Sequence, residues 1–527
     1  MTVTATVADL EVRPGESYAE ELLRVGWWAD FHARSPALRH RPALIDADGT
    51  VTWTELAARV RAVAGGLHRA GVRRGDVVMT VLHNCREGLE LTLACARIGA
   101  VTAPVSYRYV VRELAFVIGH ARPRLLVAED ELADLVAESV GASGHPVDTV
   151  FRGRGGPQGY GALTTDLQPA DHEYAGPDPG DPLWLAYTGG TTGLPKACLA
   201  RHRDLVLNFF IASHEFPIRG GDVQLLAAPY YHSQPFMYAM HQLMVGGTLV
   251  ILPKFSAAAA RAAILEYDVT VLVMAPTLYE ILLHDAPGQL PSLRTLVTAG
   301  APLRSATLER LEASWPHARM YEYYGSTEIG YASVLPPEDR QRKRRSVGRP
   351  FFGMTVAVLD PDGNEVPTGE VGEICKRGLM IAPEYAGNPD ATRELFRPGG
   401  WATAGDLGYV DDEGYLYLVD RKKDVIISGG ANVYATEVED VIATHPQVRE
   451  VAVVGVPDER WGEIVKAFVV PLPGCALDAA EVDRYCREQL AGSKRPRLVA
   501  FLDELPKNPV GKVIKAELVT EHWSTSP

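Results

Sequence analysis

Cysteine is scarce in this chain, and the cysteines that it has are scattered. The six thiols include no C-x-x-C pair and lie at positions 85, 95, 198, 375, 475 and 486. Zinc sites are commonly built from closely spaced cysteine pairs, and disulfide frames occur in cysteine-dense secreted domains, so this pattern argues against both. We therefore expect reduced thiols in a cytoplasmic protein.

Long apolar runs and an excess of positive charge are also absent. No stretch reaches the roughly 18 apolar residues of a membrane-spanning helix, and residues 1–16 contain no apolar core of a secretory signal. The 52 basic residues are outnumbered by 66 acidic ones, which gives a net charge of −14. This balance disfavours nucleic acid and anionic membranes as partners. The basic cluster at 340–345 is predicted to be a solvated loop.

The chain instead carries a long alternation of strand and helix patterns. Its 527 residues, 46% of them hydrophobic, exceed one ordinary domain. The stretches that read as strands are 77–82, 100–104, 124–128, 223–227, 248–252, 270–274 and 293–298. The stretches that read as helices are 56–67, 89–98 and 256–267. The alternation predicts an α/β fold of parallel sheets covered on both faces, with ligands beyond the carboxyl ends of strands.

The domain organisation follows from where this alternation stops. From about residue 345, short strands and turn residues indicate a small β-rich subdomain. It would close a large N-terminal domain, residues 1–420, that contains two parallel-type α/β subdomains. Residues 424–527 are predicted to form a smaller α+β domain, with a boundary at 421–423. Within it, Thr436 and Glu439 predict the start of a helix.

A glycine- and threonine-rich stretch, YTGGTTGLPK at 187–196, follows a short apolar run at 183–186. Glycines allow a tight turn whose N–H groups can surround an anion, and Lys196 adds a positive charge. Leu194 and Pro195 separate Gly193 from Lys196, so the stretch does not match a Walker A loop. It predicts a phosphate-binding loop, with an ordinary surface loop as the alternative.

Further motifs stand later in the chain: YGSTE at 324–328, WATAGD at 401–406, DRKKD at 420–424 with SGG at 428–430, and PKNPVGK at 506–512. With the loop at 187–196, and in this order, they resemble the motif series of the adenylate-forming enzymes. That superfamily comprises acyl-CoA synthetases, peptide-synthetase adenylation domains and firefly-type luciferases. The resemblance extends over about residues 27–518. It implies an acid–thiol ligase that converts a carboxylic acid and ATP to an acyl-adenylate, and then transfers the acyl group to CoA.

The resemblance also assigns catalytic roles to residues of these motifs. Lys512 corresponds to the lysine that bridges the carboxylate and the α-phosphate, and Glu328 to the Mg²⁺ ligand. Thr188 and Thr327 supply hydroxyls to the phosphates. His232 lies where the family has an aromatic residue or histidine that closes the acyl pocket and steers the reacting group.

The nucleotide contacts are implied in the same way. Tyr324 should lie against the adenine, with Glu322 at its amino group. Asp406 should bind the ribose hydroxyls and Arg421 the ribose or a phosphate. The complete predicted ATP set is Thr188, Gly189, Gly190, Thr191, Thr192, Gly193, Lys196, Gly300, Ala301, Glu322, Tyr323, Tyr324, Gly325, Ser326, Thr327, Asp406, Arg421 and Lys512.

The second half-reaction and the acid involve other residues. The resemblance implies that the small domain rotates about a hinge at Lys423, and that Gly429 and Gly430 then line the channel for the pantetheine arm of CoA. The candidates for the acyl pocket are Tyr230, Tyr231, His232, Gln234, Thr298 and Tyr331. They suggest a bulky, largely apolar acid with a polar group.

Two departures from the family pattern leave alternatives open. Ala197 replaces the usual glycine after the loop lysine, and Ala404 replaces the usual threonine of the Thr-Gly-Asp motif. A chain that only forms a thioester from a supplied adenylate is one alternative. Transfer to a separate acyl carrier protein, a luciferase-like oxygenase and a non-catalytic adenylate sensor are others. A homodimer is left open as well.

Overall fold

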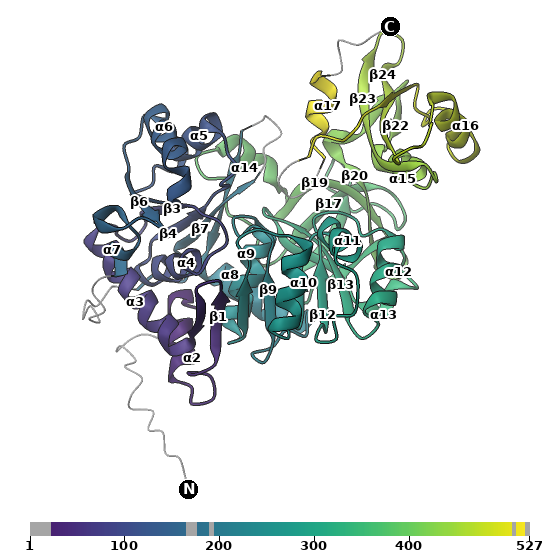
Figure 1. The fold of residues 1–527 in the computed structure, drawn as a ribbon. Helices are drawn as coiled ribbons and strands as arrows, with labels where there is room; N and C mark the ends of the chain where they lie inside the picture. Colours follow the sequence, from purple (N-terminus) through teal and green to yellow (C-terminus); the bar gives the residue numbers. More distant parts are fainter. Residues whose placement is uncertain (1–22, 165–175, 189–193, 508–512, 522–527) are drawn as a thin grey trace.

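The computed structural model describes residues 23–164, 176–188, 194–507 and 513–521 (Figure 1). They form three β-sheets of six, fourteen and five strands with helices packed around them. The five-stranded sheet belongs to the C-terminal domain, at the upper right in Figure 1. The predicted α/β class, with a large domain followed by a smaller one, is confirmed.

The six-stranded sheet has the order β6-β5-β3-β4-β7-β8. Its strands are β3 (Val77–Val81), β4 (Val101–Pro104), β5 (Leu125–Glu129), β6 (Asp148–Arg152), β7 (Pro182–Thr188) and β8 (Lys196–Arg201). The first five are parallel, and β8 runs antiparallel to β7. Helices α5 (Val111–Ala121) and α6 (Ala133–Ser143) cover its outer face.

The second sheet begins as a parallel one and continues as an antiparallel one. Its first part has the parallel order β13-β12-β11-β9-β10-β1, with β2 at the edge. These strands are β1 (Pro42–Asp46), β2 (Gly49–Thr52), β9 (Val223–Leu226), β10 (Thr248–Ile251), β11 (Val271–Val273), β12 (Thr295–Thr298) and β13 (Arg319–Ser326).

The predicted β-rich subdomain has no sheet of its own. Its strands are β14 (Gly330–Leu335), β15 (Ser346–Pro350), β16 (Thr355–Leu359), β17 (Gly372–Arg377), β18 (Phe396–Arg397), β19 (Trp401–Val410) and β20 (Leu416–Arg421). Because β14 pairs with β13, and β15 pairs with both β14 and β20, hydrogen bonds run from the parallel part into this region. The predicted β-rich region is therefore present, as a continuation of the fourteen-stranded sheet of the large domain.

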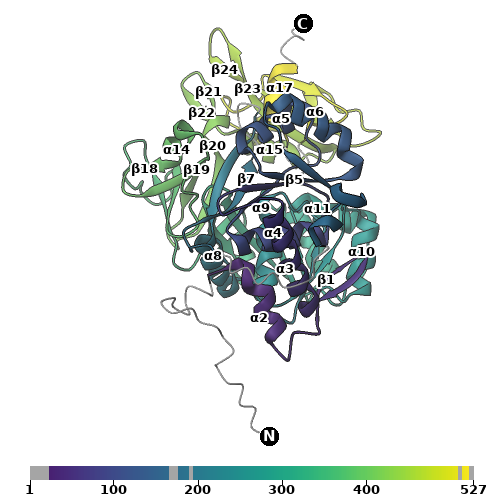
Figure 2. The ribbon, with the colours of Figure 1, turned by 90° about the vertical axis from the view of Figure 1, so that its left-hand side faces the viewer.

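Helices between the two large sheets form the main core. They are α2 (Trp28–Arg34), α3 (Trp53–Arg69), α4 (Arg86–Ile98), α8 (His202–Glu215) and α9 (Ser233–Met244). Figure 2 shows α3 and α4 on one side of β5 and β7, and α5 and α6 on the other. Thr52 and Glu55 form the capping box that starts α3, since their side chains bond each other's backbone N–H.

Further helices cover the remaining faces. The outer face of the fourteen-stranded sheet packs against α10 (Ala257–Glu266), α11 (Pro276–Asp285) and α12 (Ser305–Ser314). The short helices are α7 (Gly161–Thr164), α13 (Pro337–Arg340) and α14 (Pro389–Leu395). No helix in the described parts of the chain is long and apolar enough to cross a membrane.

The C-terminal domain is a mixed sheet with three helices. Its strands are β21 (Ile426–Ser428), β22 (Ala431–Val433), β23 (Val448–Asp458), β24 (Gly462–Pro471) and β25 (Leu498–Phe501). Its helices are α15 (Ala435–Ala443), α16 (Ala479–Gln489) and α17 (Lys515–Glu521). The predicted helix start is wrong, because the N-cap of α15 is Tyr434. Thr436 instead donates its backbone N–H to Asp420, and Glu439 accepts from the N–H of Val453.

The basic cluster is not simply a solvated loop. Arg340 is buried and donates to Glu322 at 3.1 Å. Lys343 is also buried, pairs with Asp411 at 2.7 Å and lies over the ring of Tyr415. The prediction is wrong for these two residues because distant carboxylates neutralise them, which a local charge pattern does not reveal.

Candidate active site

The predicted phosphate loop connects two antiparallel strands. Thr188 ends β7 and Lys196 begins β8, and the two residues are paired in register. The hydroxyl of Thr188 donates to the carbonyl oxygen of Lys196 at 3.5 Å. The lysine of a Walker A loop lies at the start of a helix, whereas Lys196 begins a strand. As predicted, the stretch is therefore not a Walker A loop. Gly189, Gly190, Thr191, Thr192 and Gly193 lie outside the described residues.

Three residues predicted to hold the adenosine, one each from β13, β19 and β20, contact one another. The Tyr324 hydroxyl donates to Asp406 Oδ2 at 2.7 Å, and Arg421 Nε lies 3.3 Å from Asp406 Oδ1. Asp406 and Arg421 are cross-strand neighbours. Burial and the carboxylate of Asp406 both raise the pKa of Tyr324, so its hydroxyl stays a donor. A carboxylate has about four acceptor positions, so Asp406 retains capacity for ribose hydroxyls.

The predicted metal ligand, Glu328, is tied to the phosphate-loop strand through Tyr385. The Tyr385 hydroxyl donates to Glu328 Oε1 at 2.8 Å, and Lys196 Nζ lies 5.3 Å from the centre of the Tyr385 ring. The backbone on either side is also held, since Ala386 donates to Ala197 and Ala382 donates to Glu328. Tyr385 therefore connects the loop lysine to the metal ligand. Sequence reasoning missed it, because it lies in none of the quoted motifs.

A buried lysine supports the turn that carries Glu328. Lys376 Nζ donates to the carbonyl oxygens of Ile329 and, at 2.8 Å, of Leu379. Burial lowers its pKa to about 7. Ser326 accepts from the N–H of Ile329 at 3.3 Å within the same turn. This turn is thus fixed at its base as well as at Tyr385.

Thr327 reaches the start of α9 at Ser233, the residue after His232. Thr327 Oγ1 donates to Ser233 Oγ at 3.0 Å, and His232 is the N-cap residue that precedes Ser233. Burial lowers the pKa of His232 to about 4, so the imidazole is neutral near pH 7. Its Nε2 is buried without a hydrogen bond partner in the structure. This nitrogen is available to a ligand beside Thr327.

Glu322 has partners that the motif did not indicate. Its carboxylate accepts from the N–H of Leu303 at 3.2 Å and from Arg340 at 3.1 Å. Burial raises the pKa of Glu322, while Arg340 opposes that change. Gly300 and Ala301, which follow β12, are exposed, and Gly300 has φ of +85°. Glu322 therefore fixes the backbone at Leu303 by accepting its N–H. The contact of Glu322 with the adenine stays a prediction.

The predicted acyl-pocket residues divide between two cores. Tyr331 and Tyr323 pack together, with ring centroids 4.9 Å apart. Tyr230 lies in the core between the sheets, where its hydroxyl donates to Thr92. Side chains alternate between the two faces of a strand, so Thr298 lies on the same face of β12 as Leu296. That face packs against α10–α12, whereas Tyr331 packs on the opposite face. Tyr231 lies beside His232, and Gln234 follows in the first turn of α9.

The C-terminal residues form a second group. Burial lowers the pKa of Lys423, which lies in a single 3-10 turn between β20 and β21. Gly429 and Gly430 have φ of +60° and +82° in the turn between β21 and β22. A Cβ on Gly429 would lie 2.6 Å from the Trp461 ring. The backbone therefore requires glycine at Gly429, whether or not CoA passes there.

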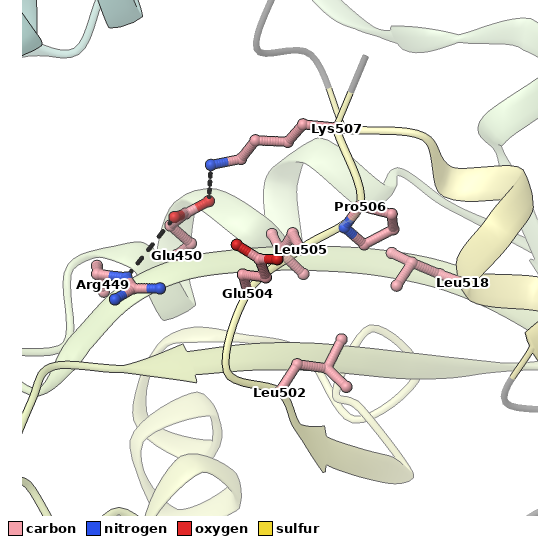
Figure 3. Close-up of a pocket in the computed structure, with 8 residues that line it drawn as sticks. All are labelled: Arg449, Glu450, Leu502, Glu504, Leu505, Pro506, Lys507 and Leu518. Atoms are coloured by element: carbon pink, nitrogen blue, oxygen red, sulfur yellow. Dashed lines mark ion pairs between the residues drawn. The ribbon is translucent and has the colours of Figure 1, made fainter. Parts of the chain in front are cut away.

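Lys512 lies outside the described residues, but the ends of its segment are anchored. Lys507 and Val513 pair in an antiparallel bridge. Lys507 Nζ lies 2.5 Å from Glu450 at a pocket of about 440 Å³ (Figure 3). The other residues that line this pocket are Arg449, Leu502, Glu504, Leu505, Pro506 and Leu518. The pocket therefore lies beside Lys507, where the segment that carries Lys512 begins.

Replacing Tyr385 by phenylalanine is expected to reduce acid-dependent pyrophosphate exchange by about tenfold, because one hydrogen bond to the Glu328 carboxylate is lost. The apparent Mg²⁺ requirement should rise with it, as Glu328 becomes free to adopt other rotamers. Exchange measured against Mg²⁺ concentration checks this. Tyr409→Phe is the control, because the Tyr409 ring stacks on Tyr417 and its hydroxyl does not bond Glu328 in the described part of the chain. An unchanged Mg²⁺ requirement in Tyr385→Phe would contradict the positioning role.

The unfolding free energy is expected to fall as the pH decreases from about 6.5 towards 4. Burial lowers the pKa of His241 to about 4, so between these values only the unfolded chain takes up the proton. His241→Gln should reduce the slope by up to about 1.4 kcal/mol per pH unit. Urea unfolding at several pH values measures it, with the exposed His214→Gln as control. Equal slopes for His241→Gln and the parent chain would show that this proton is not involved.

Comparison with known proteins agrees with this geometry. The family model for AMP-binding enzymes matches residues 31–386, and the model for the AMP-binding enzyme C-terminal domain matches residues 437–512. The first match alone covers more than half of the chain, which therefore belongs to the AMP-binding enzymes. The predicted resemblance to adenylate-forming enzymes is thereby confirmed.

Individual relatives span nearly the whole chain. A feruloyl-CoA synthase from Amycolatopsis sp. is 36% identical over 94% of this chain and 98% of that protein. The fatty acid–[acyl-carrier-protein] ligase ScoC of Streptomyces coeruleorubidus is 33% identical over 94% and 96%. ATP-bound MatB from Rhodopseudomonas palustris superposes with a TM-score of 0.85 at 33% identity, covering 94% of this chain and 98% of that one. Apo MatB, with the same coverage and identity, gives 0.75.

Proposed function

We propose that this enzyme activates a carboxylic acid with ATP and then transfers the acyl group to CoA. The observation that carries this function is that Lys196 of β8, Glu328 of the β13–β14 turn and the Tyr324–Asp406–Arg421 group are connected through Tyr385 and the YGSTE segment. Together they offer a cation, a carboxylate for a metal and an adenosine contact. These are the requirements of a site that binds a nucleoside triphosphate beside a second anion.

The chemical obstacle in the first step is the repulsion between two anions. A carboxylate must attack the α-phosphate of ATP and expel pyrophosphate. Lys196 near the phosphates and Lys512 between the carboxylate and the α-phosphate would offset that repulsion. Asp406 and Arg421 would hold the ribose, and the Thr327 and Ser233 hydroxyls would orient the reacting oxygens. A neutral His232 can donate a hydrogen bond without adding charge.

The donor set fits a magnesium ion held mainly by the nucleotide. Within the parts of the chain that the structure describes, no group of three metal-ligating side chains occurs. Mg²⁺ in nucleotide sites commonly takes one or two carboxylates together with phosphate oxygens and water. Glu328 would be that carboxylate, with one oxygen held by Tyr385. The ion would supply charge neutralisation at the phosphates.

We further propose that the described arrangement belongs to the first half-reaction. The better superposition on ATP-bound MatB than on apo MatB supports this proposal. The C-terminal domain contacts the large domain through Thr436 with Asp420, and through an ion pair of Arg345 with Asp440. Both contacts would break if the C-terminal domain rotated about Lys423 to admit CoA.

We propose a bulky, largely apolar acid as substrate and the cytoplasm as the location, where ATP and CoA are available. Acid-dependent exchange of pyrophosphate into ATP, followed by an assay for the CoA thioester, tests the function. Exchange and thioester formation together are expected. Exchange without thioester would favour a carrier protein as acceptor, the substrate named for the relative ScoC. Thioester formation only from a supplied adenylate would indicate the second half-reaction alone.

A further inference from the structure

The imidazole of His120, in the last turn of α5, contacts two segments that are far apart in sequence. Its Nδ1 lies 2.8 Å from the hydroxyl of Tyr187 near the end of β7, and its Nε2 lies 2.8 Å from the carbonyl oxygen of Ala386. Tyr187 immediately precedes Thr188, and Ala386 immediately follows Tyr385. The ring is therefore attached both to the strand that leads into the phosphate loop and to the segment that holds the predicted metal ligand.

The protons of these two contacts follow from the partners of the ring. A backbone carbonyl oxygen only accepts, so Nε2 donates to Ala386. In the neutral imidazole, Nδ1 then has a lone pair and accepts from the Tyr187 hydroxyl. Burial raises the pKa of Tyr187, so this hydroxyl keeps the proton that it donates. His120 thus joins the two segments through one donor and one acceptor.

The two partners lie on either side of the residue that follows the loop lysine. Ala197 pairs with Tyr187 in the β7–β8 ladder, and its carbonyl oxygen accepts the N–H of Ala386 at 2.8 Å. Three backbone segments are therefore neighbours at this level, with β8 in the middle, and His120 links the outer two. Lys196 is only one residue away from this level on β8.

The segment at Ala386 leads directly to the other charged group of the predicted triphosphate site. The hydroxyl of Tyr385 donates to Glu328 Oε1 at 2.8 Å, and the centre of its ring lies 5.3 Å from Lys196 Nζ. A movement of Ala386 away from β8 would move Tyr385 with it. The distance between the loop lysine and the metal ligand therefore depends on how firmly this segment is held.

The surroundings of the imidazole keep it in this position. Phe116, one turn earlier on α5, stacks on His120 with ring centroids 5.9 Å apart and 22° between the planes. Gly387 has φ of +65°, and a Cβ there would lie 3.2 Å from His120 Nε2. Another residue at Gly387 would be strained and would crowd the ring. The imidazole is thus supported on one side and given space on the other.

The simplest alternative is that His120 only stabilises the six-stranded sheet. His145 provides an example of that role, since it lies 3.0 Å from the carbonyl oxygen of Pro123, and both residues are in connections of the same sheet. The bond of His120 to Ala386 differs, because residue 386 lies between β17 and α14, in the chain of the fourteen-stranded sheet. His120 therefore fixes one large sheet against the other beside Lys196.

We propose that His120 is a positioning residue for adenylate formation, which holds Lys196 and Glu328 at the spacing that ATP and its metal ion need by linking Tyr187 to Ala386. This inference rests on the proposed ligase function. His120 acts through the residues that it holds, and these are expected to bind the triphosphate and the metal. Its loss should therefore weaken the binding of MgATP and leave the binding of the acid unchanged.

Three substitutions separate the two hydrogen bonds of the ring. His120→Asn keeps an acceptor near the position of Nδ1, His120→Gln keeps a donor near that of Nε2, and His120→Ala keeps neither. In acid-dependent pyrophosphate exchange, His120→Ala should raise KM for MgATP by about tenfold, the scale of one to two neutral hydrogen bonds, and the other two variants by less. KM for the acid should not change. Thioester formation from a supplied acyl-adenylate, which involves no triphosphate, should stay near the parent rate.

Tyr187→Phe tests the link itself, and His145→Ala is the matched control. Tyr187→Phe should raise KM for MgATP by about threefold in the parent enzyme. It should have no further effect in His120→Gln, which has already lost that bond. His145→Ala also removes a histidine bond to a backbone carbonyl, so it should lower the melting temperature as His120→Ala does. Its KM for MgATP should nevertheless equal that of the parent.

The outcomes distinguish the positioning role from packing and from the ligase function. An unchanged KM for MgATP in the His120 variants, or an equal increase in His145→Ala, would overturn the positioning role and leave the ligase function standing. Fully additive effects of Tyr187→Phe and His120→Gln would overturn the link. If His120→Ala does not fold, His120→Asn and His120→Gln decide the question by the same comparison. A parent enzyme without acid-dependent exchange would instead overturn the proposed ligase function.

Discussion

Replacing Lys512 by alanine is expected to slow acyl-adenylate formation by about 10²–10³-fold, which is typical for the loss of one group that stabilises charge in a transition state. The lysine would neutralise the carboxylate and the α-phosphate while the new bond forms. Thioester formation from a synthetic acyl-adenylate and CoA should be largely spared, because in the proposed scheme that step would use the other orientation of the C-terminal domain. The two half-reactions are measured separately, by pyrophosphate exchange and by thioester release.

The control for this variant is Lys494→Ala in the same domain. Lys494 pairs with Glu437 at 2.7 Å on the surface, and such pairs contribute little to stability. Its substitution should leave both half-reactions close to the parent rates. Equal losses in both steps for Lys512→Ala would contradict a reaction divided between two domain orientations.

Replacing Glu328 by glutamine is expected to reduce pyrophosphate exchange by about 10²-fold at ordinary Mg²⁺ concentrations. Glutamine keeps the shape and can still accept from the Tyr385 hydroxyl, so the turn should remain in place. What it lacks is the negative charge that a hard cation prefers in a ligand. Exchange measured over a range of Mg²⁺ concentrations should show partial recovery at high Mg²⁺.

Glu384→Gln is the matched control, because this exposed carboxylate is adjacent to Tyr385 in sequence. It should show the parent dependence on Mg²⁺. A Glu328→Gln enzyme with that same dependence would remove Glu328 from the metal site, whatever its overall rate. Together with Tyr385→Phe, these variants separate the effect of the charge of Glu328 on the Mg²⁺ requirement from the effect of its position.

Several features were predictable because they depend on short stretches of chain. The strands around 77–82, 223–227 and 248–252 follow from apolar runs between turns. The capping box of Thr52 and Glu55 follows from two residues in one helical turn. The strand that begins at Lys196, β8, runs antiparallel to β7. This agrees with the prediction that the stretch is not a Walker A loop, because Leu194 and Pro195 interrupt that pattern. Local sterics and hydrogen bonding decide each of these.

Other features were missed or wrong because their partners lie far away in sequence. Arg340 and Lys343 are buried against Glu322 and Asp411, although their local context resembles a charged loop. Glu439 bonds to Val453 instead of capping its own helix. Tyr385 reaches Glu328 across 57 positions and has no motif of its own. A composition or periodicity signal contains no information about such pairs.

The amino-acid sequence by itself determined the family, the α/β class and the order of the reacting groups, because these reside in contiguous motifs. Only the tertiary structure decided which residues share a pocket. Tyr230 and Tyr331 were expected in one pocket, yet they pack in different cores. Specificity depends on which faces of strands and helices are brought together, and contiguous motifs contain no information about that packing.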